Sequence, residues 1–375
     1  MALQASVITD WQALQGLSTE WNDLLKRSAS DTVFLTWEWI SAWLTSVAPN
    51  APLLTVIVRD EAGKLSAIAP FYLTRMRLLG VLPFRVCRVL GDCYSGSEYP
   101  DVITDRANEG EALEAVMKAL LDRRELWDCI WMPQMAGWTG AFTRMTTCCR
   151  NLGLKCHLRD RRFSVVRLPP TYAAYLASLS SKFRYNVRRR TKELQRAHRV
   201  ELVRCEQPGD LPKFLEALFD LHRRRWRAAG QSGSFVRRPR MVDFYERFAP
   251  VALRQGWLRL YGLKIDGGIR AVRYGLAYKG TLLGLQSGFD IESIEGGGNI
   301  LLGMVLEASI QEGLSAYDFL GDCADYKRRW GAAKRDGCDL FIGRPSLKNR
   351  LLFYKEVWPT GRFLIEDHPA GRSCQ

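Results

Sequence analysis

Glycines cluster where a predicted strand meets a predicted helix in the second half of the chain. The apolar run 283–289 indicates a strand, residues 295–299 form the loop Glu-Gly-Gly-Gly-Asn, and the pattern over 299–312 indicates a helix. Glycine lets a backbone approach a ligand closely, and the free amides at a helix N-terminus favour phosphate. The loop therefore indicates a phosphate-binding turn, and a flexible glycine-rich connector is the alternative.

Two nucleotide-binding motifs can be tested on this loop, and neither fits. Gly298 and Gly303 have the Walker spacing, but Met304 stands where that motif requires lysine. A G-x-G-x-x-G motif that starts at Gly296 would require glycine where Leu301 stands. Any phosphate bound here would belong to a different kind of site.

Residues 315–332 carry a second group of candidate side chains, which follow a short predicted strand. Asp322 and Asp325 are candidate general bases, with turn-forming aspartates as the alternative. Lys327 could pair with a phosphate or stabilise an oxyanion, and the alternative is an ordinary exposed lysine. Tyr326 could donate a proton to a leaving thiolate, but the favoured interpretation is a packed aromatic ring.

His222 is the first candidate for a general base, because the ordinary pKa of histidine lies near neutrality. It lies on a predicted helix beside Arg223, Arg224 and Arg225, whose charges favour the neutral imidazole but also indicate a solvated face. A surface or half-buried helix histidine is the alternative. No cysteine has a paired histidine in its sequence context, which leaves a covalent acyl-cysteine as a minor option.

Three stretches together resemble the GNAT acyltransferase superfamily, in the branch with a duplicated fold: the CelD-like enzymes of polysaccharide biosynthesis, related to the FemAB-like transferases. The resemblance covers residues 175–331, and the N-terminal half resembles the family only in the order of its elements. The three stretches are Ser-Lys-Phe-Arg-Tyr-Asn-Val-Arg-Arg-Arg at 181–190, Leu-His-Arg-Arg-Arg-Trp at 221–226 with Gly230 and Phe235, and residues 317–331.

The resemblance implies two tandem GNAT-like domains and transfer of an acyl group from a coenzyme A thioester to an amine or hydroxyl. It implies that residues 285–288 pair with the pantetheine arm and that the glycine loop holds the pyrophosphate. Acyl-CoA would be a co-substrate, with no tightly bound cofactor. The loop lacks the family's Arg/Gln-x-x-Gly-x-Gly/Ala form, so an acyl carrier protein or an aminoacyl-tRNA stays open as donor. The implied donor-binding residues are Gly288, Gly296, Gly297, Gly298 and Asn299.

Positive charge is concentrated in one part of the chain. The whole sequence has 54 Lys and Arg against 40 Asp and Glu, a net charge of +14. Residues 182–240 hold 17 of the basic and 6 of the acidic residues, which leaves +11 in this segment. The segment indicates an anionic partner, namely coenzyme A phosphates, an anionic lipid or polysaccharide, or tRNA, with a solvated basic face as the alternative. Zinc-finger, RNP and helix-turn-helix patterns are absent from the sequence, so specific DNA or RNA recognition is not favoured.

The sequence also bears on compartment and metal content. No signal peptide and no apolar run of about 18–20 residues is present. Ten scattered cysteines without a C-x-x-C pair favour free thiols and no metal site. We expect a cytoplasmic protein that can contact the inner membrane peripherally.

The apolar periodicity predicts a mixed α/β fold. Pro169 and Pro170 cannot continue a helix or a central strand, which predicts a linker and three parts: an N-terminal GNAT-like domain at 1–168, a C-terminal GNAT domain at 169–345, and a helix and tail at 346–375. Asp10 is the predicted cap of the first helix. Predicted helices cover 10–28, 37–47, 109–124, 140–152, 172–197 with a break near 180, 210–229, 240–255 and 299–312. Predicted strands cover 53–59, 65–73, 84–90, 127–132, 164–168, 200–205, a three-stranded meander over 257–289, 317–320 and 338–342.

Taken together, the sequence predicts an acyl-CoA-dependent N- or O-acyltransferase that acts on a saccharide or lipid amine of the cell envelope. One alternative is a FemAB-like transferase that uses aminoacyl-tRNA. The other is a non-catalytic protein whose basic surface binds membrane or nucleic acid.

Overall fold

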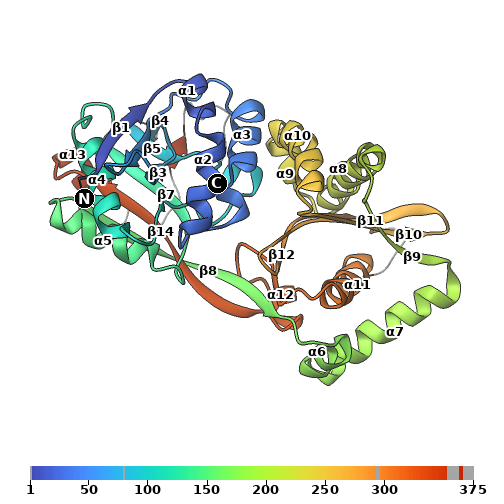
Figure 1. The fold of residues 1–375 in the computed structure, drawn as a ribbon. Coiled ribbons are helices and arrows are strands. Elements are labelled where there is room, and N and C mark those ends of the chain that lie inside the picture. Colours follow the sequence, from blue (N-terminus) through green and yellow to red (C-terminus); the bar gives the residue numbers. More distant parts are fainter. Residues whose placement is uncertain (1, 79–80, 292–295, 353–362, 366–375) are drawn as a thin grey trace. The chain divides into compact units, whose positions relative to one another are not determined.

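The structure is a computed structural model, which describes residues 2–78, 81–291, 296–352 and 363–365. The chain divides into two compact units, the first formed by Met1–Arg161 with Asp336–Gln375 and the second by Arg162–Arg335. The two boundaries lie within strands β8 (Lys155–Arg167) and β14 (Ala333–Gly343). Figure 1 shows both strands as long ribbons. The second unit is therefore inserted into the first, whereas the sequence predicted consecutive domains.

The first unit contains two groups of strands. One is an antiparallel sheet in the order β1–β2–β3–β6, and in the other β4 pairs with β5, β5 runs parallel to β7, and β7 pairs with β14. The core lies where α4 packs against β1, β2 and β3, with the fully buried Trp127 beside it. The strands are β1 (Gln4–Ile8), β2 (Thr55–Arg59), β3 (Leu65–Ala69), β4 (Phe71–Leu78), β5 (Leu82–Val89), β6 (Ile103–Thr104) and β7 (Cys129–Ala136). The α-helices are α1 (Trp11–Gln15), α2 (Ser18–Arg27), α3 (Trp37–Ser46), α4 (Glu109–Leu121) and α5 (Ala141–Asn151).

Three local details of the first unit differ from the sequence prediction. The helix predicted over 10–28 is two helices, although Asp10 does cap α1, since its Oδ1 accepts from the backbone amide of Ala13 at 2.8 Å. The strand predicted over 65–73 is interrupted at Pro70, which has no N–H to donate, so that β3 and β4 join different strand groups. Strand β1 was not predicted.

The polar segment 91–101 is folded into the first unit. Asp92, Ser97 and Asp101 in it are buried, and the hydroxyl of Ser30 donates to Asp101. Burial raises the pKa of Asp101 to about 6, although its hydrogen bonds oppose the shift. Polar side chains can be buried here because other residues supply their hydrogen bonds.

The second unit is built on a mixed sheet in the order β8–β13–β12–β11–β10–β9. Strands β9 to β12 are antiparallel, β12 runs parallel to β13, and β13 is antiparallel to β8. The predicted meander is confirmed. Its two turns contain Asp266 and Lys279, which have positive φ values of 50° and 46° and are each followed by a glycine. The strands are β9 (Val200–Arg204), β10 (Leu258–Ile265), β11 (Gly268–Tyr278), β12 (Thr281–Phe289) and β13 (Ala316–Asp318).

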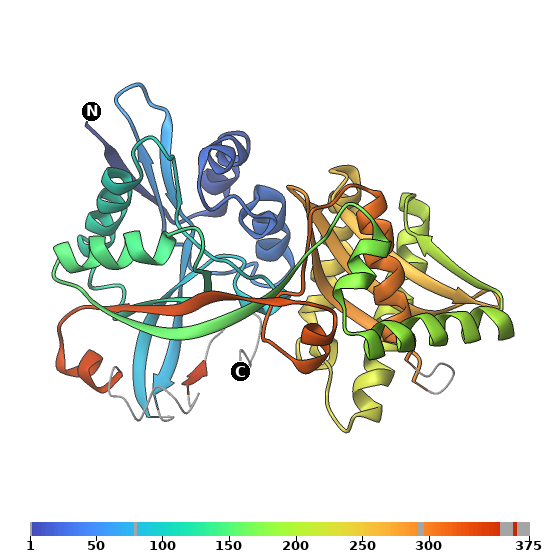
Figure 2. The ribbon, with the colours of Figure 1, turned by 90° about the horizontal axis from the view of Figure 1, so that it is seen from below.

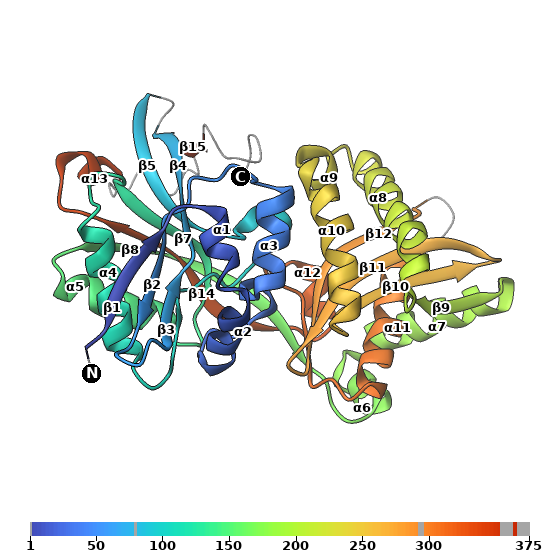
Figure 3. The ribbon, with the colours of Figure 1, turned by 45° about the horizontal axis from the view of Figure 1, so that its top comes forward.

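Helices cover both faces of this sheet. Figures 1 and 3 show α8, α9 and α10 over one face, and α11 with α6 and α7 over the other. Figure 2 shows α6 and α7 in front of the second face. The predicted break in the helix over 172–197 is confirmed, because α6 ends at Ser178 and the Ser180 hydroxyl caps α7 by accepting from the backbone amide of Phe183. The helices are α6 (Tyr172–Ser178), α7 (Ser181–Ala197), α8 (Leu211–Ala228), α9 (Ser234–Arg237), α10 (Arg240–Arg254), α11 (Gly297–Gln311) and α12 (Asp325–Arg329).

The predicted C-terminal helix and tail are only partly within the described residues. The helix α13 (Leu347–Leu352) and the short strand β15 (Phe363–Ile365) are present, and β15 pairs with β4. The rest of the predicted tail, 353–362 and 366–375, lies outside the described residues. The mixed α/β class is confirmed.

The described residues include no helix that is both long and apolar enough to cross a membrane. They also contain no group of three or more His, Cys, Asp or Glu side chains placed to hold a metal ion. Eight cysteines within the described residues are free thiols, namely Cys87, Cys129, Cys148, Cys149, Cys156, Cys205, Cys323 and Cys338.

Candidate active site

Strands β12 and β13 pair over only three residues and then part. Thr281, Leu282 and Leu283 pair with Ala316, Tyr317 and Asp318, where β13 ends, while β12 continues to Phe289. On its other edge β12 carries a bulge at Leu285, between the pairs formed by Gly284 and Gln286 with β11. Bulges re-aim a strand and often lie next to active sites. The stretch from Gly284 to Phe289 therefore presents backbone groups that β13 does not use.

Helix α11 begins just beyond this open edge. Gly296 precedes the helix with φ of 77°, a conformation that favours glycine, and a Cβ added there would lie 2.8 Å from the Nη1 of Arg190 on α7. A Cβ added at Gly298 would lie 2.8 Å from the ring of Phe289. The first amides of a helix have no acceptor inside it, so the N-terminus of α11 can receive an anion beside Arg190. Glu295, the first residue of the predicted loop, lies outside the described residues.

Asn299 also holds a buried side chain in place. Its Oδ1 accepts from the Nε1 of Trp330 at 3.1 Å, and Trp330 is fully buried. Trp330 in turn lies edge-on to Phe183 of α7, with ring centroids 5.1 Å apart. Asn299 therefore connects the first turn of α11 to the segment that follows α12.

His222 is buried, with 3% of its surface exposed, and its ring lies edge-on to Phe235 of α9, with ring centroids 4.7 Å apart. Its Nε2 accepts hydrogen bonds from the Nε1 of Trp226 at 3.0 Å and from the hydroxyl of Ser234 at 3.2 Å. Burial lowers the pKa of His222 to about 4, and the charges of Arg225 and Arg237 lower it further. The imidazole is neutral at pH 7, as the arginines beside it led us to expect, but its Nε2 lone pair is already engaged.

Lys327 is buried and closes a turn. Its Nζ donates to the backbone oxygens of Leu320 at 2.6 Å and Asp322 at 2.8 Å, and it lies 3.4 Å from the Asp322 carboxylate. Leu320 has φ of 56°, which is unusual for a leucine, so the ammonium holds a turn that the backbone alone disfavours. This arrangement gives Lys327 a structural task, and its predicted role toward phosphate or an oxyanion stays a prediction.

The two candidate aspartates are both exposed. The Asp322 side chain is 85% exposed and lies close enough to Tyr326 to affect its pKa. Asp325 is paired with Arg328 three residues later, and that hydrogen bond lowers the pKa of Asp325. The structure therefore brings Asp322 to the turn beside Tyr326 and places Asp325 on the surface of α12.

Two arginines near β12 were not among the predicted site residues. Arg225 of α8 reaches Ser287, with its Nη1 3.4 Å from the hydroxyl, and lies over the Phe289 ring at 4.7 Å. Arg273 of β11 stands opposite Ser287 in the register and donates to the hydroxyl of Tyr317 at 2.8 Å. Their signal in the sequence is weak, because 54 basic residues offer many such candidates.

Tyr326 is close to both arginines. Burial raises the pKa of Tyr326, and the charges of Arg273 and Arg225 act in the opposite direction. The phenol is therefore protonated near neutral pH and remains 43% exposed. The open stretch of β12 thus carries hydroxyl groups and guanidinium groups along one side and helix amides at its end.

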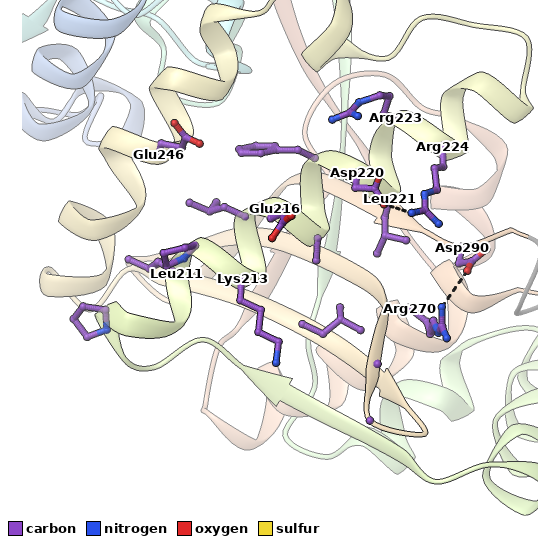
Figure 4. Close-up of a pocket in the computed structure, with 18 of the residues that line it drawn as sticks. Leu211, Lys213, Glu216, Asp220, Leu221, Arg223, Arg224, Glu246, Arg270 and Asp290 are labelled. Atoms are coloured by element: carbon purple, nitrogen blue, oxygen red, sulfur yellow. Dashed lines mark ion pairs between the residues drawn. The ribbon is translucent and has the colours of Figure 1, made fainter.

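A separate pocket lies elsewhere in the second unit. It has a volume of about 1140 Å³ and is lined by α8, α10 and the turn between β10 and β11 (Figure 4). Ion pairs join Arg224 to Asp220 at 2.7 Å and Arg270 to Asp290 at 3.8 Å along its wall. None of the predicted site residues lines it, so it carries no part of the site described above.

Known proteins resemble this chain in one domain and in the overall fold. Residues 181–328 match the family model of the acetyltransferase (GNAT) domain. The crystal structure of FemX is 13% identical with a TM-score of 0.63, over 93% of this chain and 98% of that chain. A search of curated proteins found no match.

Two other solved structures share the fold at low identity. The C-terminal domain of a putative lysylphosphatidylglycerol synthetase from Agrobacterium fabrum is 11% identical with a TM-score of 0.52, over 90% of this chain and 94% of that chain. A conserved protein of unknown function from Bacteroides thetaiotaomicron is 12% identical with a TM-score of 0.53, over 91% of this chain and 100% of that chain. The matched model identifies residues 181–328 as an acetyltransferase (GNAT) domain, and the whole chain shares the fold of FemX.

Proposed function

We propose that the second unit transfers an acyl group from acyl-CoA to an amine or hydroxyl of a cell-envelope saccharide or lipid. The observation that carries this proposal is that β12 and β13 part after Leu283 and that α11 begins beyond the end of the open stretch of β12. An open strand edge offers hydrogen bonds to an amide-containing arm, and the helix amides beside it suit a pyrophosphate.

The residues that would hold the donor fit its chemistry. The backbone of residues 285–288 would pair with the uncharged pantetheine arm. The amides of Gly297 and Gly298 and the guanidinium of Arg190 would meet the phosphates, since Arg190 lies beside Gly296. An acyl carrier protein carries the same pantetheine arm and stays an alternative donor.

Direct transfer requires two proton movements. The acceptor nitrogen or oxygen attacks the thioester carbonyl carbon and loses a proton to a base, while the carbon–sulfur bond breaks and the thiolate takes up a proton. Tyr326 is protonated near neutral pH and would supply that second proton. Asp322 is the predicted base whose negative charge raises the pKa of Tyr326. It would accept the first proton, directly or through water.

The envelope acceptor is supported by two observations of different kinds. One structural neighbour is named as a putative lysylphosphatidylglycerol synthetase, and the name describes a lipid product. The basic segment 182–240 would attract anionic lipids or polymers. Polysaccharide biosynthesis, peripheral binding at the inner membrane and a cytoplasmic location belong to the same proposal.

The test is to titrate acetyl-CoA and palmitoyl-CoA into the full chain by calorimetry and to measure release of free coenzyme A with amino-sugar and lipid-amine acceptors. Arg190→Gln should weaken acyl-CoA binding about tenfold, the loss of one charge-assisted contact to phosphate. Arg189→Gln is the matched control, because Arg189 is the next residue of α7 and is paired with Glu193 at 2.7 Å. Failure of the wild-type chain to bind either acyl-CoA or acylated carrier protein would contradict the proposal.

An aminoacyl-tRNA donor is favoured by the exposed basic face of α7, which includes Lys182, Arg188 and Arg189. Binding of tRNA through this face would weaken steeply as salt rises, because each phosphate contact releases a counterion. Retention of charged tRNA with a steep salt slope, together with no affinity for acyl-CoA, would favour this donor over the first.

A further inference from the structure

Arg225 and Arg273 converge on Ser287 from different elements. Arg225 comes from α8 and approaches the Ser287 hydroxyl to 3.4 Å, while Arg273 comes from β11 and faces Ser287 across the β11–β12 register. Burial lowers the pKa of Arg225, and the positive charge of Arg273 lowers it further. Two cations therefore lie close together beside the open stretch of β12.

This pair has no acidic partner in the described part of the chain. Both side chains are half-buried, and neither forms an ion pair with a carboxylate there. The Nε of Arg273 is buried and has no hydrogen-bond partner among the described residues. Placing two like charges together away from water is unfavourable unless an anion or further hydrogen bonds compensate them. The two guanidinium groups together suit an anionic ligand.

We propose that Arg225 and Arg273 bind a carboxylate or phosphate group that the acceptor carries close to its nucleophile. This inference rests on the proposed acyl transfer, because it places the anion beside the stretch 285–288 assigned to the uncharged pantetheine arm. The donor phosphates are assigned to the N-terminus of α11, so the arginine pair is left for the acceptor. A planar guanidinium binds both carboxylate and phosphate through paired N–H groups. Acceptors of this class include amino sugars that bear an acid group.

The experiment uses three amino sugars that differ in their charge. Glucosamine has no acid group, glucosamine 6-phosphate adds a phosphate, and muramic acid adds a carboxylate. Binding of each to the full chain is measured by calorimetry without a donor. We expect at least one of the two acidic sugars to bind about tenfold more tightly than glucosamine and to lose this advantage as ionic strength rises.

Variants assign the effect to the two arginines. Arg225→Gln and Arg273→Gln should each remove most of the advantage, whereas Arg223→Gln should retain it, because Arg223 is an exposed arginine on the same helix. Thermal melting checks that each variant folds. If either Gln variant fails to fold, Arg225→Lys and Arg273→Lys retain the charge, lose the planar fork, and should still reduce the advantage.

Several results would overturn the inference. Equal affinity of the wild-type chain for all three sugars would do so, and so would an advantage that survives in both folded Gln variants. If the Gln variants lost kcat equally with glucosamine and with glucosamine 6-phosphate, the arginines would stabilise an oxyanion instead. If the arginines affected only the preference for succinyl-CoA over acetyl-CoA, the bound anion would belong to the acyl group. Acyl-CoA binding is titrated separately: its presence without anion selectivity contradicts only this inference, and its absence contradicts the proposed function.

Discussion

Gly288 on β12 lies directly against the backbone of His222 on α8. A Cβ added at Gly288 would overlap the His222 backbone nitrogen and would lie 2.8 Å from the carbonyl carbon of Leu221. Backbone atoms cannot rotate away as a side chain can, so the glycine sets how closely α8 approaches the sheet. Gly288 was predicted as a donor-binding residue, and this contact gives it a packing task as well.

Replacement of Gly288 by alanine should therefore destabilise the second unit. We expect Gly288→Ala to lower the free energy of unfolding by about 1–3 kcal/mol, as overpacking of a close contact does. Chemical denaturation measures the change. Gly209→Ala is the matched control, because a Cβ at Gly209 meets nothing within 4 Å. Equal stability of the two variants would show that α8 can move away from β12 without cost.

Removal of the Lys327 ammonium should loosen the turn at Leu320. Lys327→Met leaves the backbone oxygens of Leu320 and Asp322 without their donor, and we expect a loss of about 1–3 kcal/mol in unfolding free energy. Lys334→Met, at an exposed lysine nearby, should change stability little. A Lys327→Met variant that is fully stable but has a lower kcat would instead favour the predicted role at an oxyanion.

Stability should depend on pH through His222. An unfolded histidine titrates near pH 6.5, whereas the pKa of folded His222 is lowered to about 4, so the unfolded chain binds more protons between these values. The contribution of the buried, neutral His222 to stability is therefore fully present above about pH 7, and it is lost as the pH falls from 6.5 toward 4. Between pH 7 and pH 5 this one group should cost about 2 kcal/mol.

Urea denaturation at pH 7 and pH 5 tests the histidine directly. The decrease in unfolding free energy between the two pH values should be smaller in His222→Gln than in the wild-type chain, because glutamine does not titrate. An identical decrease in both proteins would mean that the imidazole is not buried in its neutral form.

Substitutions at Asn299 should separate its packing task from donor binding. Asn299→Ala removes the acceptor of the buried Trp330 N–H and should cost about 1–3 kcal/mol in stability. Asn299→Asp keeps an acceptor there and adds a negative charge in the first turn of α11, which favours the helix but repels phosphate. We expect Asn299→Asp to fold normally and to bind acyl-CoA about tenfold more weakly at low salt. Unchanged affinity in Asn299→Asp would contradict a phosphate site at this helix end.

Much of the second unit could be predicted from its sequence, because its signals are local. The two turns of the meander need positive φ, and Asp266-Gly267 and Lys279-Gly280 supply it. The helix after the glycine loop was predicted at 299–312 and is found at Gly297–Gln311. The order of strands in the sheet is not a local property, and neither is the return of 336–343 to the first unit.

The environment of single side chains was harder to predict. Lys327 was weighed as an exposed lysine and is buried, because its partners are backbone oxygens of a turn that no sequence pattern reports. His222 was placed among solvated arginines, yet it follows Leu215 and Leu218 at seven and four residues, the spacing of one buried helix face. That spacing was the signal that could have located it. The pairing of Arg225 with Arg273 joins residues 48 positions apart and has no local signature.

The inserted position of the second unit has a consequence for synthesis on the ribosome. Domains generally fold in the order in which they emerge, the N-terminal one first. Here β14 must pair with β7 to complete the first unit, and its residues 336–343 emerge only after the whole second unit has been made. The part of the chain that is translated first is therefore the last to finish folding, and until then the edge of β7 that β14 will cover is exposed to other chains and to chaperones.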